Sequence, residues 1–199
     1  MTAPDFSILT KDNIVAFLED IFERRGGEEY LGEPVTMAEH MLQGAMIAEQ
    51  NNQDEAIVVS ALLHDIGHFT SEFGTFSMAD SQDRCHEEAG AVVLEPFFPA
   101  VVVDCVRHHV AAKRYLCATN PNYLGRLTPA SIHSLKLQGG PMGADEVEAF
   151  AQNPNIDIIL KVRHLDDEGK VAGLKSPPFA HFAPMVQHVV DAHYKSTTA

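Results

Sequence analysis

The chain has 199 residues, and 28 Asp and Glu residues against 14 Lys and Arg residues give it a formal net charge of −14. This acidic balance argues against nucleic acid and against anionic membrane surfaces, since both need Lys and Arg to neutralise phosphate. No apolar run approaches the ~20 residues that span a bilayer. The first five residues lack the basic and apolar regions of a secretion signal. We therefore expect one domain over residues 1–199, with neither of these partners.

Cysteine and histidine usage narrows the class of protein further. Cys85, Cys105 and Cys117 are odd in number and lack C-x-x-C spacing, which predicts reduced thiols and a cytoplasmic location. Histidine is in surplus, with 11 residues. Histidine is therefore the unusual feature of the composition.

The hydrophobic periodicity is helical nearly throughout, and no stretch alternates with period two, so the sequence predicts an all-α helical bundle. Thr36 and Glu39 have the T-x-x-E spacing of a capping box. Residues 67–83 are polar and rich in Gly and Ser, and are expected to form a loop. The expected helices are residues 14–22 (capped by Thr10 or Asp12 and ended by Gly26-Gly27), 37 to about 50, Asp54 to about His64, about 84–94, Pro99 onward, 128 to about 138, 145–152, 155–163, and a last helix containing Phe182 to Val190.

Six His and Asp residues lie at helix ends or on helix faces bordered by apolar residues. Buried imidazoles and carboxylates are costly unless they are paired or bind a metal. Nitrogen and oxygen ligands suit Fe, Mn, Mg or Zn rather than an iron–sulfur cluster. The candidate metal ligands are His40, His64, Asp65, His86, His109 and Asp166.

Adjacent ligands such as His64 and Asp65 need a helix end, because neighbours on a helix diverge by about 100°. At such an end Asp65 can turn toward the centre that His64 faces, and we expect Gly67 to accommodate the bend. The two oxygens of Asp65 could bridge two ions. Six ligands are too many for one ion with an open position, so we expect two ions that share Asp65.

The pattern H…HD…D resembles the HD-domain superfamily, an all-α fold populated mostly by metal-dependent phosphohydrolases. Longer matches between about Tyr30 and Lys170 resemble one branch, the mixed-valent di-iron oxygenases that cleave 1-hydroxy-2-aminoalkylphosphonates. The block H-V-A-A-K-R-Y-L together with Y-x-G-E is the most specific of these matches. The matching segments are Tyr30-Leu31-Gly32-Glu33, His64-Asp65-Ile66-Gly67-His68, His109-Val110-Ala111-Ala112-Lys113-Arg114-Tyr115-Leu116, Gln138-Gly139-Gly140-Pro141-Met142 and Asp166-Asp167-Glu168-Gly169-Lys170.

This resemblance implies two iron ions, Fe(II) and Fe(III), with O2 as co-substrate and a small phosphonate as substrate. C–P cleavage would then give a carboxylic acid and phosphate. Tyr30 would occupy the second iron until the substrate arrives, and Glu33 would receive the cationic nitrogen of the substrate. One iron would be held by His40, His64, Asp65 and Asp166, the other by Asp65, His86 and His109, and the phosphonate by His68, Lys113, Ser131, Ser134 and Arg163.

The methylation state of the substrate amine is a separate question. A trimethylammonium group cannot donate hydrogen bonds to Glu33, and needs charge pairing with aromatic or apolar contacts. Phe69, Phe73, Phe76 and Met78 could supply them, although a lid or core patch fits them equally well. The overall resemblance, including this loop, is to the branch with trimethylated substrates, which implies (R)-1-hydroxy-2-(trimethylammonio)ethylphosphonate as the substrate and glycine betaine as the product. The alternatives are the primary amine giving glycine, a metal-dependent phosphohydrolase, and a non-catalytic regulator of the same fold.

Several site residues also have plainer interpretations. Asp167 could replace Asp166 as a ligand, because only the motif register separates them. Ser131 and Ser134 share a helix face, but surface serines would look the same. His108 is expected to point away from the site that its neighbour His109 faces.

Overall fold

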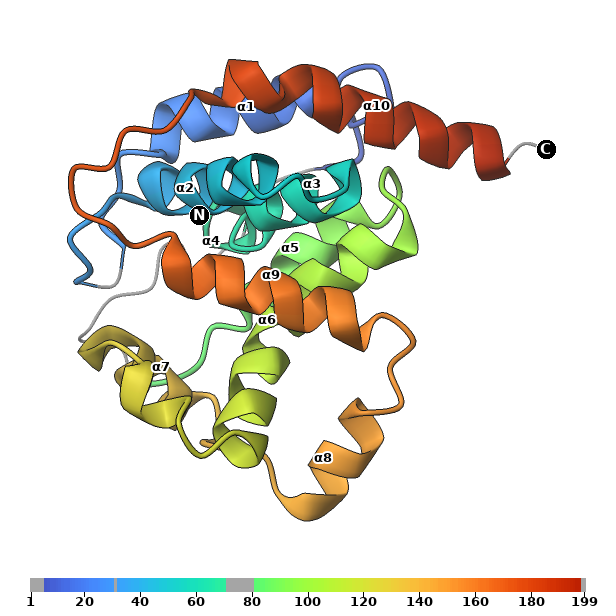
Figure 1. Ribbon diagram of the computed structural model, residues 1–199. Helices are drawn as coiled ribbons and strands as arrows, with labels where there is room; N and C mark the ends of the chain where they lie inside the picture. The colour runs from blue at the N-terminus through green and yellow to red at the C-terminus, as the bar shows by residue number, and fades with distance from the viewer. Residues whose placement is uncertain (1–5, 31, 71–80, 198–199) are drawn as a thin grey trace.

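The computed structural model describes residues 6–30, 32–70 and 81–197. Within these ranges the chain is helical, and its only extended pairing is an isolated antiparallel bridge between Glu29 and Thr36 (Figure 1). The all-α prediction is therefore confirmed. The helices are α1 (Ile14–Arg25), α2 (Met37–Gln50), α3 (Glu55–Leu63), α4 (Gly67–Thr70), α5 (His86–Leu94), α6 (Ala100–Thr119), the 3-10 turn η1 (Leu124–Arg126), α7 (Pro129–Leu137), α8 (Ala144–Phe150), α9 (Ile156–Glu168) and α10 (Phe179–Thr197).

Four helices, α2, α3, α6 and α9, pack against one another at the centre of the bundle. The helix α10 lies along α1 and α3, while α7 and α8 lie near the C-terminal half of α6 (Figure 1). The core between these helices is apolar and contains Leu18, Met41, Leu62, Val106 and Val162, each 0% exposed. No helix in the described ranges is long and apolar enough to cross a membrane.

The capping predictions have a mixed outcome. The capping box at the start of α2 is confirmed, since Thr36 Oγ1 accepts from the Glu39 amide and Glu39 Oε2 accepts from the Thr36 amide. The cap of α1 is predicted wrongly. Asn13 precedes α1, and no side chain caps the helix. The Thr10 amide instead donates to Asn13 Oδ1 at 2.7 Å, so Thr10 belongs to the preceding turn.

Two predicted boundaries near the site are wrong. The loop expected over residues 67–83 begins with the helical turn α4, and its residues 71–80 lie outside the described part of the chain. The helix α9 runs to Glu168, five residues beyond its expected end. As a result Arg163 and Asp166 are one turn apart on one helix, and both are buried.

Gly67 allows two segments to approach closely, rather than relieving a bend. Its φ lies outside the left-handed region, and an added Cβ would lie 1.7 Å from the His86 carbonyl oxygen. The backbones of α4 and α5 therefore touch at Gly67, and this contact fixes the position from which the His86 side chain projects.

We expect Gly67→Ala to destabilise the protein by ~3 kcal/mol or more, since a backbone carbonyl cannot retreat as a flexible side chain can. Thermal or urea unfolding measures this change. Gly27→Ala is the matched control, because nothing lies within 4 Å of its added Cβ. An unfolding midpoint like that of the control would show that α4 and α5 are not in contact.

Candidate metal centre and active site

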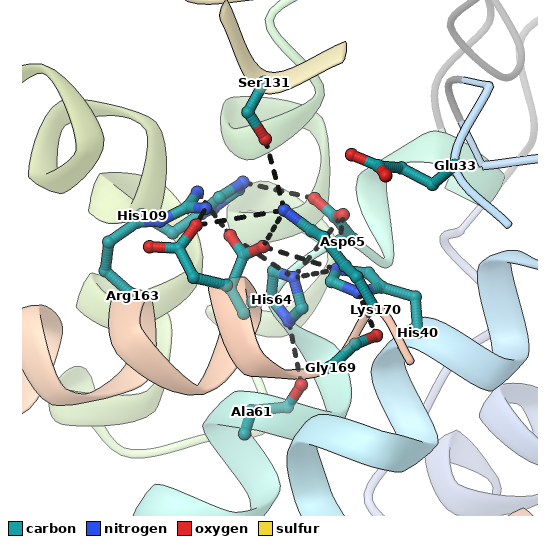
Figure 2. A network of polar contacts seen from close by, with 12 residues as sticks. Glu33, His40, Ala61, His64, Asp65, His109, Ser131, Arg163, Gly169 and Lys170 are labelled. Carbon is teal, nitrogen blue, oxygen red and sulfur yellow. Dashed lines mark hydrogen bonds and ion pairs between the residues drawn. The ribbon is translucent and has the colours of Figure 1, made fainter. Parts of the chain in front are cut away.

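A pocket reaches the buried ligand cluster from the side of α6, α7 and α9. Figure 2 shows the polar side chains of the cluster converging from separate helices. The pocket is lined by Tyr30, Glu33, Asp65, His68, Asp83, His86, His109, Val110, Lys113, Ser131, Ser134, Leu137, Gln138, Arg163, Asp166 and Lys170.

A first group of ligand atoms comes from α2, the end of α3, and α9. His40 Nε2 lies 2.9 Å from His64 Nε2. The two oxygens of Asp166 lie 3.5 Å and 3.7 Å from these nitrogens. All three side chains are almost fully buried. The structure thus brings together three of the predicted ligands in an arrangement that can hold one metal ion.

The second group of ligand atoms lies on the other side of Asp65. His86 is the first residue of α5, and its Nε2 lies 3.0 Å from Nε2 of His109 on α6. Asp65 Oδ1 is 3.1 Å from His86 Nε2 and 3.2 Å from His109 Nε2. Asp65 Oδ2 is 3.4 Å from the corresponding nitrogens of both His40 and His64. One carboxylate oxygen therefore faces each pair of imidazoles, as a bridging ligand requires.

The hydrogen bonds of the imidazoles fit a metal centre. The Nδ1 atoms of His40, His64 and His109 donate to the carbonyls of Gly169, Ala61 and Val106 at 2.7–2.9 Å. Because a carbonyl only accepts, each Nδ1 carries the proton and a neutral ring presents a lone pair at Nε2. Lone pairs 2.9–3.0 Å apart repel unless a proton or a cation lies near both. The donor set suits Fe, Mn or Zn.

The charges of the cluster hold both aspartates ionised. Burial acts to raise the pKa of Asp65, but the imidazoles that face it, His64 first and then His109 and His40, keep that pKa well below its usual range. The same holds for the pKa of Asp166, where Arg163 and Lys170 outweigh burial. Two buried carboxylates thus remain anionic and available to cations.

Three of the residues predicted to bind phosphonate form one side of the pocket. Lys113 Nζ donates to Ser134 Oγ at 2.8 Å, and Ser131 lies one turn away on the same face of α7. All three residues are buried, so the surface interpretation of the two serines is wrong. Burial, and then the Arg163 guanidinium, lowers the pKa of Lys113 to about 7. This crowding of cations is favourable to an entering anion.

His68 lies between the pocket and the second ligand group. Its ring stacks on His86 with centroids 4.0 Å apart, and its Nε2 is 3.9 Å from Asp65 Oδ1. Its buried Nδ1 has no hydrogen-bond partner among the described residues. Burial and the neighbouring His86 hold its pKa well below the usual value, so the ring is a neutral donor or acceptor.

Arg163 is held by two carboxylates. Its Nη1 donates to Asp166 and its Nη2 to Asp167, while its buried Nε has no hydrogen-bond partner in the described chain. Asp167 also accepts from the Tyr123 hydroxyl. Asp166 therefore lies with His40 and His64, whereas Asp167 points to the Arg163–Tyr123 side of α9.

Tyr30 and Glu33 both line the pocket beside the ligand cluster. The Tyr30 ring stacks on His40, with centroids 4.0 Å apart and planes 14° apart. Burial, and then the charges of Asp65 and Asp166, raises the Tyr30 pKa well above its usual value. Glu33 accepts a hydrogen bond from Thr128, whose hydroxyl also accepts from the Ser131 amide at the start of α7. Glu33 is thereby fixed relative to the serines.

Two aromatic predictions can be compared with the structure. Phe69 packs against Phe22 with ring centroids 6.0 Å apart and lies under the Arg25 guanidinium, so it belongs to the core and not to a cation-binding loop. Phe73, Phe76 and Met78 lie outside the described residues, as does Leu31 of the Y-x-G-E match. His108 packs on Phe150 away from the ligands, as expected.

Comparison with known proteins gives the family. The model of the HD domain matches residues 37–136. A protein of Leisingera caerulea is 68% identical over 193 residues, which cover 97% of this chain and 98% of the relative. The chain belongs to the HD-domain family. That relative is named 1-hydroxy-2-(trimethylamino)ethylphosphonate dioxygenase (glycine-betaine-forming).

Two further relatives are less similar and also cover most of this chain. Hydroxymethylphosphonate dioxygenase of Gimesia maris is 39% identical over 166 residues, which cover 83% of each chain. An uncharacterised protein of Acanthamoeba polyphaga mimivirus is 33% identical over 165 residues, which cover 82% of this chain and 75% of the relative. Two relatives of this HD-domain chain are thus named as dioxygenases that act on phosphonates.

Two charged pocket residues escape the sequence analysis. Lys170 lies within a matching segment but receives no role there, although it follows Asp166 by four residues. It lies just beyond the end of α9 at Glu168, and its Nζ is 3.2 Å from Asp166 Oδ1. Asp83 lines the pocket and accepts a hydrogen bond from the Cys85 amide. No sequence pattern distinguishes it from a surface aspartate.

Proposed function

We propose that this protein is a dioxygenase that uses O2 to cleave the C–P bond of 1-hydroxy-2-(trimethylammonio)ethylphosphonate, giving glycine betaine and phosphate. The observation that carries this proposal is the 68% identity, over nearly the whole of both chains, to the relative named for that reaction. The pocket supports it, because its lining includes both the cations Lys113 and Arg163 and the Glu33 carboxylate. A zwitterion with an anionic and a cationic end fits such a pocket.

We propose two iron ions as cofactor, one held by His40, His64, Asp65 and Asp166 and the other by Asp65, His86 and His109. When bound, the metals supply the redox chemistry that removes hydrogen from an unactivated carbinol carbon, which no side chain can do. Asp65, with one oxygen toward each imidazole pair, keeps the two sets of ligands at a fixed separation.

The other pocket residues bind and orient the substrate. Lys113, Ser131, Ser134, Arg163 and His68 receive the phosphonate. Arg163 Nε and His68 Nδ1, which have no hydrogen-bond partner among the described residues, supply further polar atoms. Glu33 receives the trimethylammonium group through its charge. Tyr30, stacked on His40 beside the pocket, occupies the space near the ligands until the substrate enters.

We further propose that one HD domain extends beyond the matched residues 37–136, because Asp166 and Arg163 of α9 complete the site. The cytoplasmic location remains a proposal that rests on the three free cysteines.

Oxygen dependence tests the proposed reaction. We expect iron-loaded protein mixed anaerobically with the trimethylammonio substrate to release no phosphate until O2 is admitted, and then to form glycine betaine and phosphate in equal amounts. The primary-amine analogue and hydroxymethylphosphonate, tested side by side, should be cleaved with at least ~10-fold lower kcat/KM, since both lack the methylated cation. Release of phosphate without O2 would contradict oxidative cleavage, and O2-independent hydrolysis of a phosphomonoester would instead indicate a phosphohydrolase.

A further inference from the structure

Lys170 is a buried cation on the pocket wall that the proposed function leaves without a role. Its side chain is 7% exposed, and its Nζ lies 3.2 Å from Asp166 Oδ1. The same Nζ donates to Ser131 Oγ at 3.3 Å and lies 5.7 Å from the centroid of the Tyr30 ring. Figure 2 shows this nitrogen near the centre of the polar network.

The backbone on both sides of Lys170 is fixed by buried groups of α2. The Gly169 carbonyl accepts from His40 Nδ1, and an added Cβ at Gly169 would lie 2.7 Å from the His40 carbonyl oxygen. On the other side, the Val171 amide donates to Gln43 Oε1, and Gln43 Nε2 donates to the Val171 carbonyl, each at 2.9 Å. Gln43 is 0% exposed. The backbone at Lys170 is therefore held in place before a ligand binds, so that binding costs little conformational entropy there.

The contacts of Lys170 place its ammonium beside the residues proposed to hold phosphonate. Ser131 contacts Lys170, and Ser134, one turn away, contacts Lys113. The two lysines therefore approach the same face of α7 from different sides. Arg163 lies on the α9 wall of the same pocket, four residues before Asp167. A phosphonate dianion has three oxygens that accept hydrogen bonds. The three cations and the two serine hydroxyls can donate hydrogen bonds to all three oxygens.

We propose that Lys170 binds the phosphonate group of the substrate directly, as a third cation beside Lys113 and Arg163. This inference rests on the proposed function, since it names a further contact of the proposed substrate. The alternative is that Lys170 serves only as a counter-ion for Asp166 and Asp167, which lie 3.2 Å and 3.9 Å from its Nζ. If Lys170 contacts the phosphonate, removing the Lys170 charge weakens anion binding. If Lys170 is only a counter-ion for the two aspartates, anion binding does not weaken.

The test measures binding of inorganic phosphate by calorimetry to the full chain, both metal-free and iron-loaded. Lys170→Gln removes the charge and keeps a hydrogen-bond donor, and Lys170→Met is a second neutral variant if the first does not fold. We expect the Kd of phosphate to rise about 10- to 100-fold in the neutral variants and less than about 3-fold in Lys170→Arg. Lys161→Met, at an exposed position of α9, is the control and should leave Kd unchanged.

Turnover and metal content separate this inference from its alternatives. We expect the KM of the phosphonate to rise with the Kd of phosphate while the iron content stays that of the wild type. If the neutral variants bind phosphate as tightly as the wild type, both metal-free and iron-loaded, the proposed role of Lys170 is wrong. This holds even if their iron content falls. Weakened phosphate binding without any O2-dependent cleavage would uphold Lys170 as an anion-binding residue and contradict the proposed function instead.

Discussion

Asp65→Asn should remove at least half of the bound iron and lower turnover by about 1000-fold or more. The amide oxygen of Asn is a weaker ligand than a carboxylate oxygen, and its NH2 group cannot coordinate a metal. Asp65 faces both imidazole pairs, at 3.1–3.4 Å from their Nε2 atoms, so its loss affects both ligand groups. Because the proposed reaction depends on the redox metals, its rate falls when the metal content falls. Metal analysis and phosphate release measure the two effects.

The variant needs a control that exchanges a carboxylate elsewhere. Asp104→Asn on α6 changes a half-buried carboxylate that pairs with Asn155, outside the pocket lining, and should keep iron and activity. Iron should also raise the unfolding temperature of the wild type more than that of Asp65→Asn, because binding to the folded state alone stabilises it. Two full equivalents of iron in Asp65→Asn would refute the bridging role.

Glu33→Gln should raise the KM of the trimethylammonio substrate about 10- to 100-fold, with unchanged iron content. Glu33 is half-buried, and losing one partner of such a charge pair costs about 1.5–3 kcal/mol, between the values of exposed and buried pairs. The Gln oxygen can still accept the Thr128 hydrogen bond, so the local geometry is kept. Steady-state kinetics with the substrate measures the change.

Hydroxymethylphosphonate is the matched ligand for this variant, because it has the hydroxyl and the phosphonate without the cation. Its affinity, measured as competitive inhibition, should differ less than about 2-fold between wild type and Glu33→Gln, since Glu33 acts on the charge alone. An equal loss of affinity for both ligands would mean that Glu33 shapes the pocket. Unchanged affinity for both ligands would mean that the trimethylammonium group binds elsewhere in the pocket.

Much of the fold was predictable because its determinants are local. Apolar residues at helical spacing define the central helices, and the capping box at Thr36 lies within four residues of chain. The errors fall where local signals are weak. Thr10 looks like a cap but pairs with Asn13, and α9 continues past Arg163 because packing on α2 and α6 sustains its last turn.

The kinds of side chain at the site, and the helices that carry them, follow from the amino-acid sequence. The way in which those side chains meet depends on how the helices pack. His40 pairs with Gly169 across 129 residues, which sets its tautomer, and Phe69 lies in the core because Phe22 is there to receive it. Lys170 gains its place through Gln43, 128 residues before Val171 in the chain. Such contacts depend on distances between separate helices, and no local pattern encodes those distances.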